Sequence, residues 1–375
     1  MNKKFIYLFL FFFIVLFASC EKQNSNGGGT TPPGEEQPPN GGGKEPQNFI
    51  YPNEDWSVAI PEKYGFKANL GEIIENYIAS TPQLTTTGLM VIVGGEVIHS
   101  YGNLTELSYL ASCRKSILAM MMGRFVENGT IDLSLTLEEM GMDDVGGLLP
   151  IEKEATILDC ITARSGVYHP ASNSGDDTDS APPRGSKTPG EYFLYNNWDF
   201  NIAGTIFENL TGSNIYQALY TELALPLEFQ DFSLDAQRKG GTLSISQYPA
   251  YHIYLSTRDM ARIGYVMLRK GKWKERQIIS KEWVEQITSA YTSVDEMNPR
   301  GKYPLWGYGY MWWVWDGNAN REGYLGAYTA IGAGGQFITV LPALDMVVVQ
   351  KTSTNDNNAD KYWTLLGRII NAKIN

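Results

Sequence analysis

The sequence predicts an α/β fold in which a sheet domain holds a largely helical insertion. Strand-like segments lie near the start and at the end of the folded part, and helix-like segments lie between them. No internal repeat is visible. The 375 residues are enough for one large domain or for two domains of ordinary size.

The first expected elements are a helix and a strand pair. Residues 70–78 are helix-like, whereas residues 88–93 and 97–101 are strand-like. Gly94-Gly95 lies between the two strands, and glycine adopts the positive φ that a tight hairpin turn requires. These residues therefore predict an antiparallel hairpin.

The middle of the chain is expected to be helical. Residues 110–126 are apolar on nearly every face and end at Asn128-Gly129, which is typical of a buried central helix. A polar loop over residues 171–190 is long enough to favour a functional role. Further helices are expected over residues 157–164, 200–210, 258–268 and 280–288.

Strands return towards the C-terminus, over residues 309–315, 336–341 and 346–351, and a last helix is expected over residues 361–370. The sheet is therefore expected to take residues of about 49–107 and 256–375. The helical part is expected to take about 108–255.

The composition excludes several classes of protein. A hydrophobic content of 43% excludes wholesale disorder, and a formal net charge of -11 argues against a nucleic-acid-binding surface. Three cysteines cannot form a disulfide framework, and three widely spaced histidines do not predict a metal site. No cofactor is expected.

Residues 1–19 are predicted to be an export signal. Lys3 and Lys4 precede an apolar run over residues 5–17, which is shorter than the roughly 20 residues of a membrane span. Ala18-Ser19 before Cys20 resembles a bacterial lipoprotein signal, in which Cys20 is acylated after cleavage. The alternative is a plain secretory signal cleaved near Ser19.

Residues 20–48 are predicted to be a tether, because Gly, Pro, Glu, Asn and Thr dominate there without apolar periodicity. The folded domain is then expected over residues 49–375. This layout predicts an exported protein, lipid-anchored to a bacterial membrane on its periplasmic or cell-surface side.

Ser112-Cys113-Arg114-Lys115 is the motif that best predicts chemistry. At the start of a helix, residues three apart share a face with Cβ atoms roughly 5–6 Å apart, so the lysine amine can reach the serine hydroxyl. Burial can lower the lysine pKa from about 10.4 and make the amine a base. Ser19 and Lys22 have the same spacing inside the export signal, so the helical context is what distinguishes Ser112.

Two further elements follow in the chain. Tyr195-Asn196-Asn197 comes after the long loop and just before an expected helix. Residues 330–336, Ala-Ile-Gly-Ala-Gly-Gly-Gln, run into an expected strand, where glycines let another backbone or a substrate approach closely. The alternative for the glycines is a bulged or tightly packed edge strand.

Ser112-x-x-Lys115, Tyr195-x-Asn197 and the glycine-rich strand, in this order, resemble the serine β-lactamase/penicillin-binding-protein superfamily. The sequences around Arg164, Tyr195 and Arg258 extend the likeness, which covers about residue 51 to the C-terminus and is strongest to nylon-oligomer hydrolases and class C-like esterases. The resemblance implies a β-lactamase/transpeptidase-like fold, with an antiparallel sheet flanked by helices and a helical subdomain.

The resemblance also implies roles for individual residues. Ser112 would form an acyl-enzyme, with Lys115 and Tyr195 as general base and acid and Asn197 in support. The backbone amides of Ser112 and Ala333 would form the oxyanion hole. Lower-ranked candidates for substrate contact are Tyr168, His169, Gly332 and Gly334.

The sequence departs from the family at Ala330, where relatives carry a lysine or histidine that contacts a substrate carboxylate. We therefore expect a small ester, amide or peptide substrate rather than efficient β-lactam turnover.

Arg114 is expected to be a structural ion-pair partner. The alternatives are a weak β-lactamase or a DD-peptidase acting on cell-wall peptides, and a non-catalytic surface lipoprotein that binds glycan or peptide. An α/β-hydrolase is excluded because no serine lies in Gly-x-Ser-x-Gly.

Overall fold

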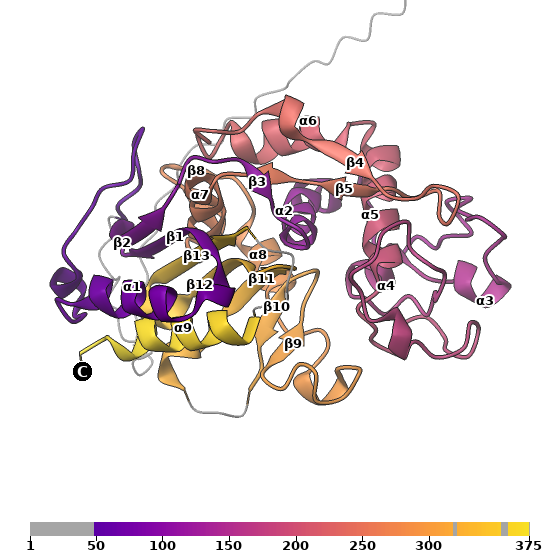
Figure 1. Cartoon of the computed structure of the whole chain (residues 1–375). Helices are drawn as coiled ribbons and strands as arrows, with labels where there is room; N and C mark the ends of the chain where they lie inside the picture. Colours follow the sequence, from indigo (N-terminus) through magenta and orange to yellow (C-terminus); the bar gives the residue numbers. More distant parts are fainter. Residues whose placement is uncertain (1–48, 318–320, 354–358, 375) are drawn as a thin grey trace, which may run out of the picture. The chain divides into compact units, whose positions relative to one another are not determined.

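The centre of the fold is a seven-stranded sheet in the order β2-β1-β13-β12-β11-β10-β9, with every neighbouring pair antiparallel (Figure 1). The structure, a computed structural model, describes residues 49–317, 321–353 and 359–374. Strands from both ends of the chain therefore meet at the β1–β13 pair. The strands are β1 (Thr86–Val93), β2 (Glu96–Gly102), β9 (Trp306–Tyr308), β10 (Trp313–Trp315), β11 (Tyr328–Gly332), β12 (Gln336–Leu341) and β13 (Met346–Thr352).

Side chains alternate between the two faces of this sheet, and each face is covered by helices (Figure 1). On one face, Val91 and Val348 pack with α1 (Leu70–Ser80) and α9 (Ala359–Asn371). On the other face, Ile92 and Val347 pack with α2 (Cys113–Glu127) and α7 (Thr257–Leu268). The sheet is thus buried on both sides.

Most of the regular secondary structure between β2 and α7 is helical, as expected. The two longest helices there, α2 and α5 (Asn197–Thr211), have 15 residues each, and α5 follows a loop and begins at the N-cap Asn196. Besides short 3₁₀ and π turns, the remaining elements of the described chain are α3 (Pro150–Lys153), α4 (Ile157–Ile161), α6 (Ile215–Leu219), α8 (Lys281–Ile287), and the short strands β3 (Ser108–Tyr109), β4 (Arg238–Gly240), β5 (Ala250–His252), β6 (Tyr254–Leu255), β7 (Lys272–Trp273) and β8 (Arg276–Gln277). The predicted sheet with a helical insertion is confirmed.

Several expected elements differ from the structure in their bounds. The strand expected over 309–315 is broken, because a turn at 309–312, with Met311 at φ 58°, separates β9 from β10. The helix expected over 157–164 ends at Ile161, since Ala163 adopts φ 59°. The central helix begins at Cys113 rather than at residue 110.

The predicted signal peptide (1–19), the acylated Cys20 and the tether (20–48) lie outside the described residues and stay predictions. None of the helices within the described ranges is both long enough and apolar enough to cross a membrane.

Candidate active site

Ser112 is the N-cap residue of the central helix α2. Ala111, directly before it, has a φ of 48°, a left-handed conformation that is unusual for alanine. This turn carries the chain from β3 into the helix. No backbone or side-chain acceptor within the described ranges takes the amide hydrogen of Ser112. The amide at the start of the helix is therefore available to a ligand.

Lys115 lies one turn further along α2, and its amine meets three polar side chains. Lys115 Nζ lies 3.0 Å from Ser112 Oγ, 2.6 Å from Tyr195 OH and 2.6 Å from Asn197 Oδ1. The lysine side chain is only 1% exposed. The structure thus brings together the four residues that the sequence singled out, although 80 residues separate Lys115 from Tyr195.

Asn197 is fixed so that its oxygen faces the lysine. Its Nδ2 donates to the Ser174 carbonyl at 2.8 Å, and its backbone N–H donates to Asp176 Oδ2 at 3.2 Å. Since the amide nitrogen is already bonded to the loop, Oδ1 is left to accept from Lys115. The polar loop of 171–190 therefore helps to orient the site.

The surroundings of Lys115 favour its neutral form. Burial, followed by the positive charge of Arg114, holds the pKa of the Lys115 amine well below its usual range, while Asp176 and Asp177 act in the opposite direction. Burial also raises the pKa of Tyr195 above its ordinary value. A neutral amine beside a protonated phenol is a pair that can accept one proton and donate another.

The glycine-rich segment forms the turn between β11 and β12, next to the start of α2. A Cβ on Gly332 would lie 2.3 Å from the Leu110 carbonyl oxygen and 3.3 Å from Ala111 Cβ, so the end of β11 abuts the chain just before Ser112. No acceptor in the described chain takes the backbone N–H of Ala333. The predicted close approach at a glycine is thus present.

Three buried polar side chains hold this turn in place. Thr352 Oγ1 donates to the Gly334 carbonyl at 2.5 Å, and Gln350 Nε2 donates to the Gly335 carbonyl at 3.2 Å. Gln336 Nε2 in turn donates to Thr352 Oγ1 at 3.0 Å. Because these bonds take up the carbonyl groups, the turn has a defined conformation.

A pocket of about 520 Å³ opens over Ser112, Tyr195 and the glycine-rich turn. Most of its wall is apolar, and its aromatic members are Tyr195, Tyr303, Trp306, Trp313, Phe337 and Trp363. Ile331 lines the pocket, whereas Ala330, its neighbour in β11, is fully buried and is not among the lining residues. The pocket can accommodate an apolar group attached to a carbonyl that reaches Ser112.

The sequence did not indicate the polar cluster at the rim of the pocket. Asp177 accepts from the Tyr303 hydroxyl at 2.5 Å and forms an ion pair with Lys302. The backbone N–H of Asp177 donates to the Tyr195 carbonyl at 2.9 Å. These residues come from segments 125 residues apart, so no local pattern could have joined them.

The lower-ranked candidates for substrate contact divide in two. Gly332 and Gly334 line the pocket, whereas Tyr168 and His169 are not among its lining residues. His169 is 3% exposed, and its Nε2 lies 2.8 Å from the Val145 carbonyl oxygen. The buried position of His169 suits a structural role. The predicted substrate contacts of Tyr168 and His169 are therefore not supported by the lining of the pocket.

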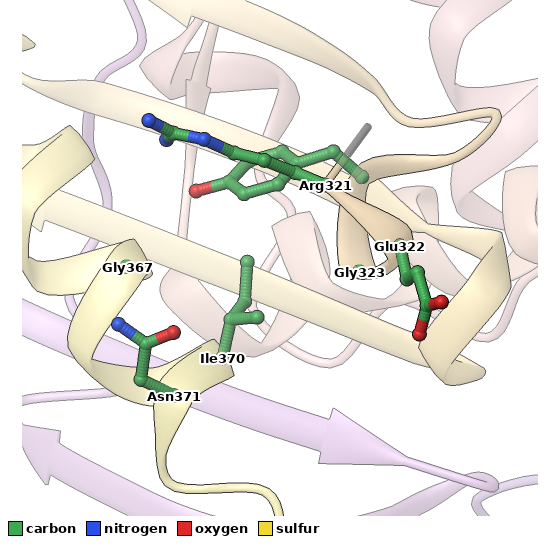
Figure 2. Close-up of a pocket in the computed structure, with 7 residues that line it drawn as sticks. Arg321, Glu322, Gly323, Gly367, Ile370 and Asn371 are labelled. Atoms are coloured by element: carbon green, nitrogen blue, oxygen red, sulfur yellow. The ribbon is translucent and has the colours of Figure 1, made fainter. Parts of the chain in front are cut away.

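A second pocket, of about 400 Å³, lies between the 3₁₀ turn Glu322–Tyr324 and α9 (Figure 2). Arg321 and Glu322 point away from each other in Figure 2, while Ile370 and Asn371 face the pocket from α9. Its described lining residues include no Ser, Cys, His or Lys. Glu322 is the carboxylate among them, but these residues hold no serine–lysine pair like Ser112 and Lys115.

Comparison with known proteins agrees with this geometry. Residues 74–368 match the family described as Beta-lactamase. The chain belongs to the beta-lactamase family. Over 310 residues it is 25% identical to a 6-aminohexanoate-dimer hydrolase of Paenarthrobacter ureafaciens, covering 74% of this chain and 75% of that protein.

Two solved structures show the same fold. One is a penicillin-binding protein from Bacillus halodurans, with a TM-score of 0.58, 14% identity and coverage of 78% of this chain and 99% of the other. The second is EstCE1, a hydrolase with promiscuous acyltransferase activity, with a TM-score of 0.59, 16% identity and coverage of 82% and 99%. At such identities these two structures report on the fold alone.

The predicted superfamily, its nylon-oligomer hydrolase branch and the predicted fold class are therefore confirmed. The predicted enzyme class is also confirmed: the protein is a serine hydrolase of the β-lactamase type.

Proposed function

We propose that this hydrolase cleaves esters or amides through an acyl-enzyme on Ser112, with Lys115 as the base. The observation that carries the proposal is the position of the buried Lys115 amine, 3.0 Å from Ser112 Oγ and 2.6 Å from Tyr195 OH. A neutral amine has a lone pair, which can accept the serine proton as the oxygen becomes a nucleophile.

Acylation then proceeds in two steps. Ser112 Oγ bonds to the substrate carbonyl carbon while its proton passes to Lys115 Nζ, and the carbonyl oxygen takes the negative charge. The backbone N–H groups of Ser112 and Ala333 donate to that oxygen. When the intermediate collapses, Tyr195 gives its proton to the leaving oxygen or nitrogen and is reprotonated by Lys115.

Deacylation uses the same groups in reverse. A water molecule loses a proton to the Lys115–Tyr195 pair as its oxygen bonds to the acyl carbon. The Oγ–carbon bond breaks, and the proton returns to Ser112. The enzyme is left in its starting state, with the acid released as product.

The wall of the pocket supports a substrate whose acyl group is uncharged. Ile331 and Ala330 stand where many relatives place a hydroxyl and a cation, and neither can bind a carboxylate. Lys302 lines the pocket but is paired with Asp177. The relative from Paenarthrobacter ureafaciens is named for an amide substrate, so both esters and amides belong to the proposal.

Activity against cell-wall peptides or β-lactams is the second candidate. The observation in its favour is the presence of Lys302 in the pocket lining, because a lysine released from Asp177 would be able to meet a carboxylate. A non-catalytic role as a surface binding protein would leave the Ser112, Lys115 and Tyr195 cluster without a purpose.

The test is hydrolysis of a small chromogenic ester by the purified domain. Ser112→Ala and Lys115→Ala should each abolish turnover, and the double variant should be little worse than either single one, because groups that act as a unit give non-additive losses. Near-full activity of Ser112→Ala would contradict the proposal.

The proposal also includes the cellular location of the enzyme. A lipid on Cys20 followed by the tether would hold the hydrolase on the periplasmic or cell-surface side of a bacterial membrane. The motivation is the order of charged, apolar and small residues before Cys20.

A further inference from the structure

Arg114 is a buried cation without an anionic partner. It lies in the first turn of α2, beside Lys115, and is 1% exposed. No ion pair joins it to a carboxylate anywhere in the part of the chain that the structure describes. The expectation that Arg114 is an ion-pair partner was therefore wrong.

The contacts of the guanidinium group are with uncharged side chains. Nη2 donates to Asn201 Oδ1 at 2.8 Å, and the guanidinium carbon lies 4.3 Å from the centre of the Tyr251 ring. Nη1 has no hydrogen-bond partner among the described residues. A neutral amide and an aromatic ring solvate the charge in part but do not neutralise it.

Four other elements place neutral groups near Arg114. Besides Asn201 of α5, these are Tyr109 of β3, Tyr216 of α6, and Tyr251 and His252 of β5. Burial and the charge of Arg114 lower the pKa of His252, so this ring stays uncharged. An arginine cannot release its proton in a protein, so the positive charge persists.

Burying a charge costs free energy unless the charge is paired with an opposite charge and hydrogen-bonded. We propose that Arg114 is a positioning residue that acts through Lys115, because its uncompensated charge keeps the neighbouring amine in the neutral, proton-accepting form. This inference rests on the proposed function, in which Lys115 is the base.

The charges that face Lys115 from other elements act against Arg114. Asp176 and Asp177, in the loop before α5, favour the charged amine. Tyr195 and Cys113 are neutral, since burial raises the pKa of both groups. Without the arginine, burial would be left to oppose the two carboxylates, and the pKa of the Lys115 amine would rise.

The experiment measures the pH dependence of kcat/KM for a short-chain chromogenic ester, whose acid limb reports the base of the free enzyme. Arg114→Gln removes the charge. Asn201→Asp keeps the arginine and places a carboxylate 2.8 Å from its Nη2. Both variants should move the acid limb to higher pH.

Asn201→Ala is the matched control, because it removes the same hydrogen bond but leaves the charge of Arg114 in place. Its acid limb should stay at the wild-type pH even if its rate falls. The rate of inactivation by a fluorophosphonate, measured over the same pH range, gives a second profile that does not depend on substrate binding or product release.

An unmoved acid limb in Asn201→Asp would overturn the inference. Asn201→Asp tests the inference even if Arg114→Gln fails to fold, because it retains the arginine and strengthens the hydrogen bond between residue 201 and Arg114. Failure of the proposed function is a separate result, seen as full activity in Ser112→Ala. If Asn201→Ala shifts the limb as far as Asn201→Asp, the effect belongs to the hydrogen bond, and the inference is likewise wrong.

Discussion

Gly332 meets Leu110 so closely that a Cβ on the glycine would lie 2.3 Å from the Leu110 carbonyl oxygen. Two segments more than 200 residues apart in the chain are thereby joined at the active site. One leads into Ser112, the proposed nucleophile, and the other into the turn that carries the Ala333 amide. The distance between the two proposed oxyanion donors depends on this contact.

Gly332→Ala should therefore lower kcat for ester hydrolysis. The added carbon must push β11 away from the start of α2, and misplacement of catalytic groups by about 1 Å can cost on the order of 10²-fold in rate. Gly367→Ala is the control, since nothing lies within 4 Å of its added Cβ and alanine favours a helix. Full activity of Gly332→Ala would show that the contact is not needed.

Tyr195→Phe should fold normally but lose about 10²–10⁴ in kcat, the usual contribution of a positioned proton-transfer group. The ring keeps its packing against Phe200 at 5.1 Å and Trp313 at 5.4 Å, so the change removes only the hydroxyl and its contacts with Lys115 and Ser112. Tyr328→Phe, which changes a buried tyrosine outside the pocket lining, serves as the control. An unchanged rate in Tyr195→Phe would make its hydroxyl merely structural.

Short-chain esters should be cleaved with a clearly higher kcat/KM than benzylpenicillin or a chromogenic cephalosporin. A lysine–carboxylate contact contributes roughly 1.5–3 kcal/mol, so its absence should weaken acylation by penicillins about 10- to 100-fold. The comparison uses one preparation, with Ser112→Ala as the blank.

The cations near the active site show which residue could bind the carboxylate of a β-lactam. Arg184 is bonded to Glu152 and Lys187 to Glu191, and neither lines the pocket, which leaves Lys302 as the cation among its described lining residues. Cephalosporin turnover that rivals ester turnover, and that falls in Lys302→Met, would overturn the prediction and assign the carboxylate to Lys302.

The sequence predicted those site residues that lie close together in the chain and form a recognisable motif. Ser112 and Lys115 share one turn of a helix, and Tyr195 and Asn197 flank the start of another. The Asp177, Lys302 and Tyr303 cluster depends on chain segments that meet only in the folded protein. The break at Met311 was also hidden, because a positive φ at a methionine has no signature in sequence.

Cys20→Ser should leave the exported protein soluble, or retained with its signal uncleaved. The thioether to the lipid forms at the cysteine sulfur, and a serine hydroxyl does not replace it. The measurement is the distribution of the protein between detergent-extracted membranes and the aqueous fraction. Release of the wild-type protein without detergent would mean that a plain secretory signal is present instead.

The most direct test of the central claim is intact-mass analysis after exposure to a fluorophosphonate, followed by peptide mapping. One adduct per chain should form, and it should map to Ser112. It should be absent from Ser112→Ala and form more slowly in Lys115→Ala. An adduct on another residue, or the absence of any adduct on a preparation that hydrolyses esters, would contradict the assignment of Ser112 as the nucleophile.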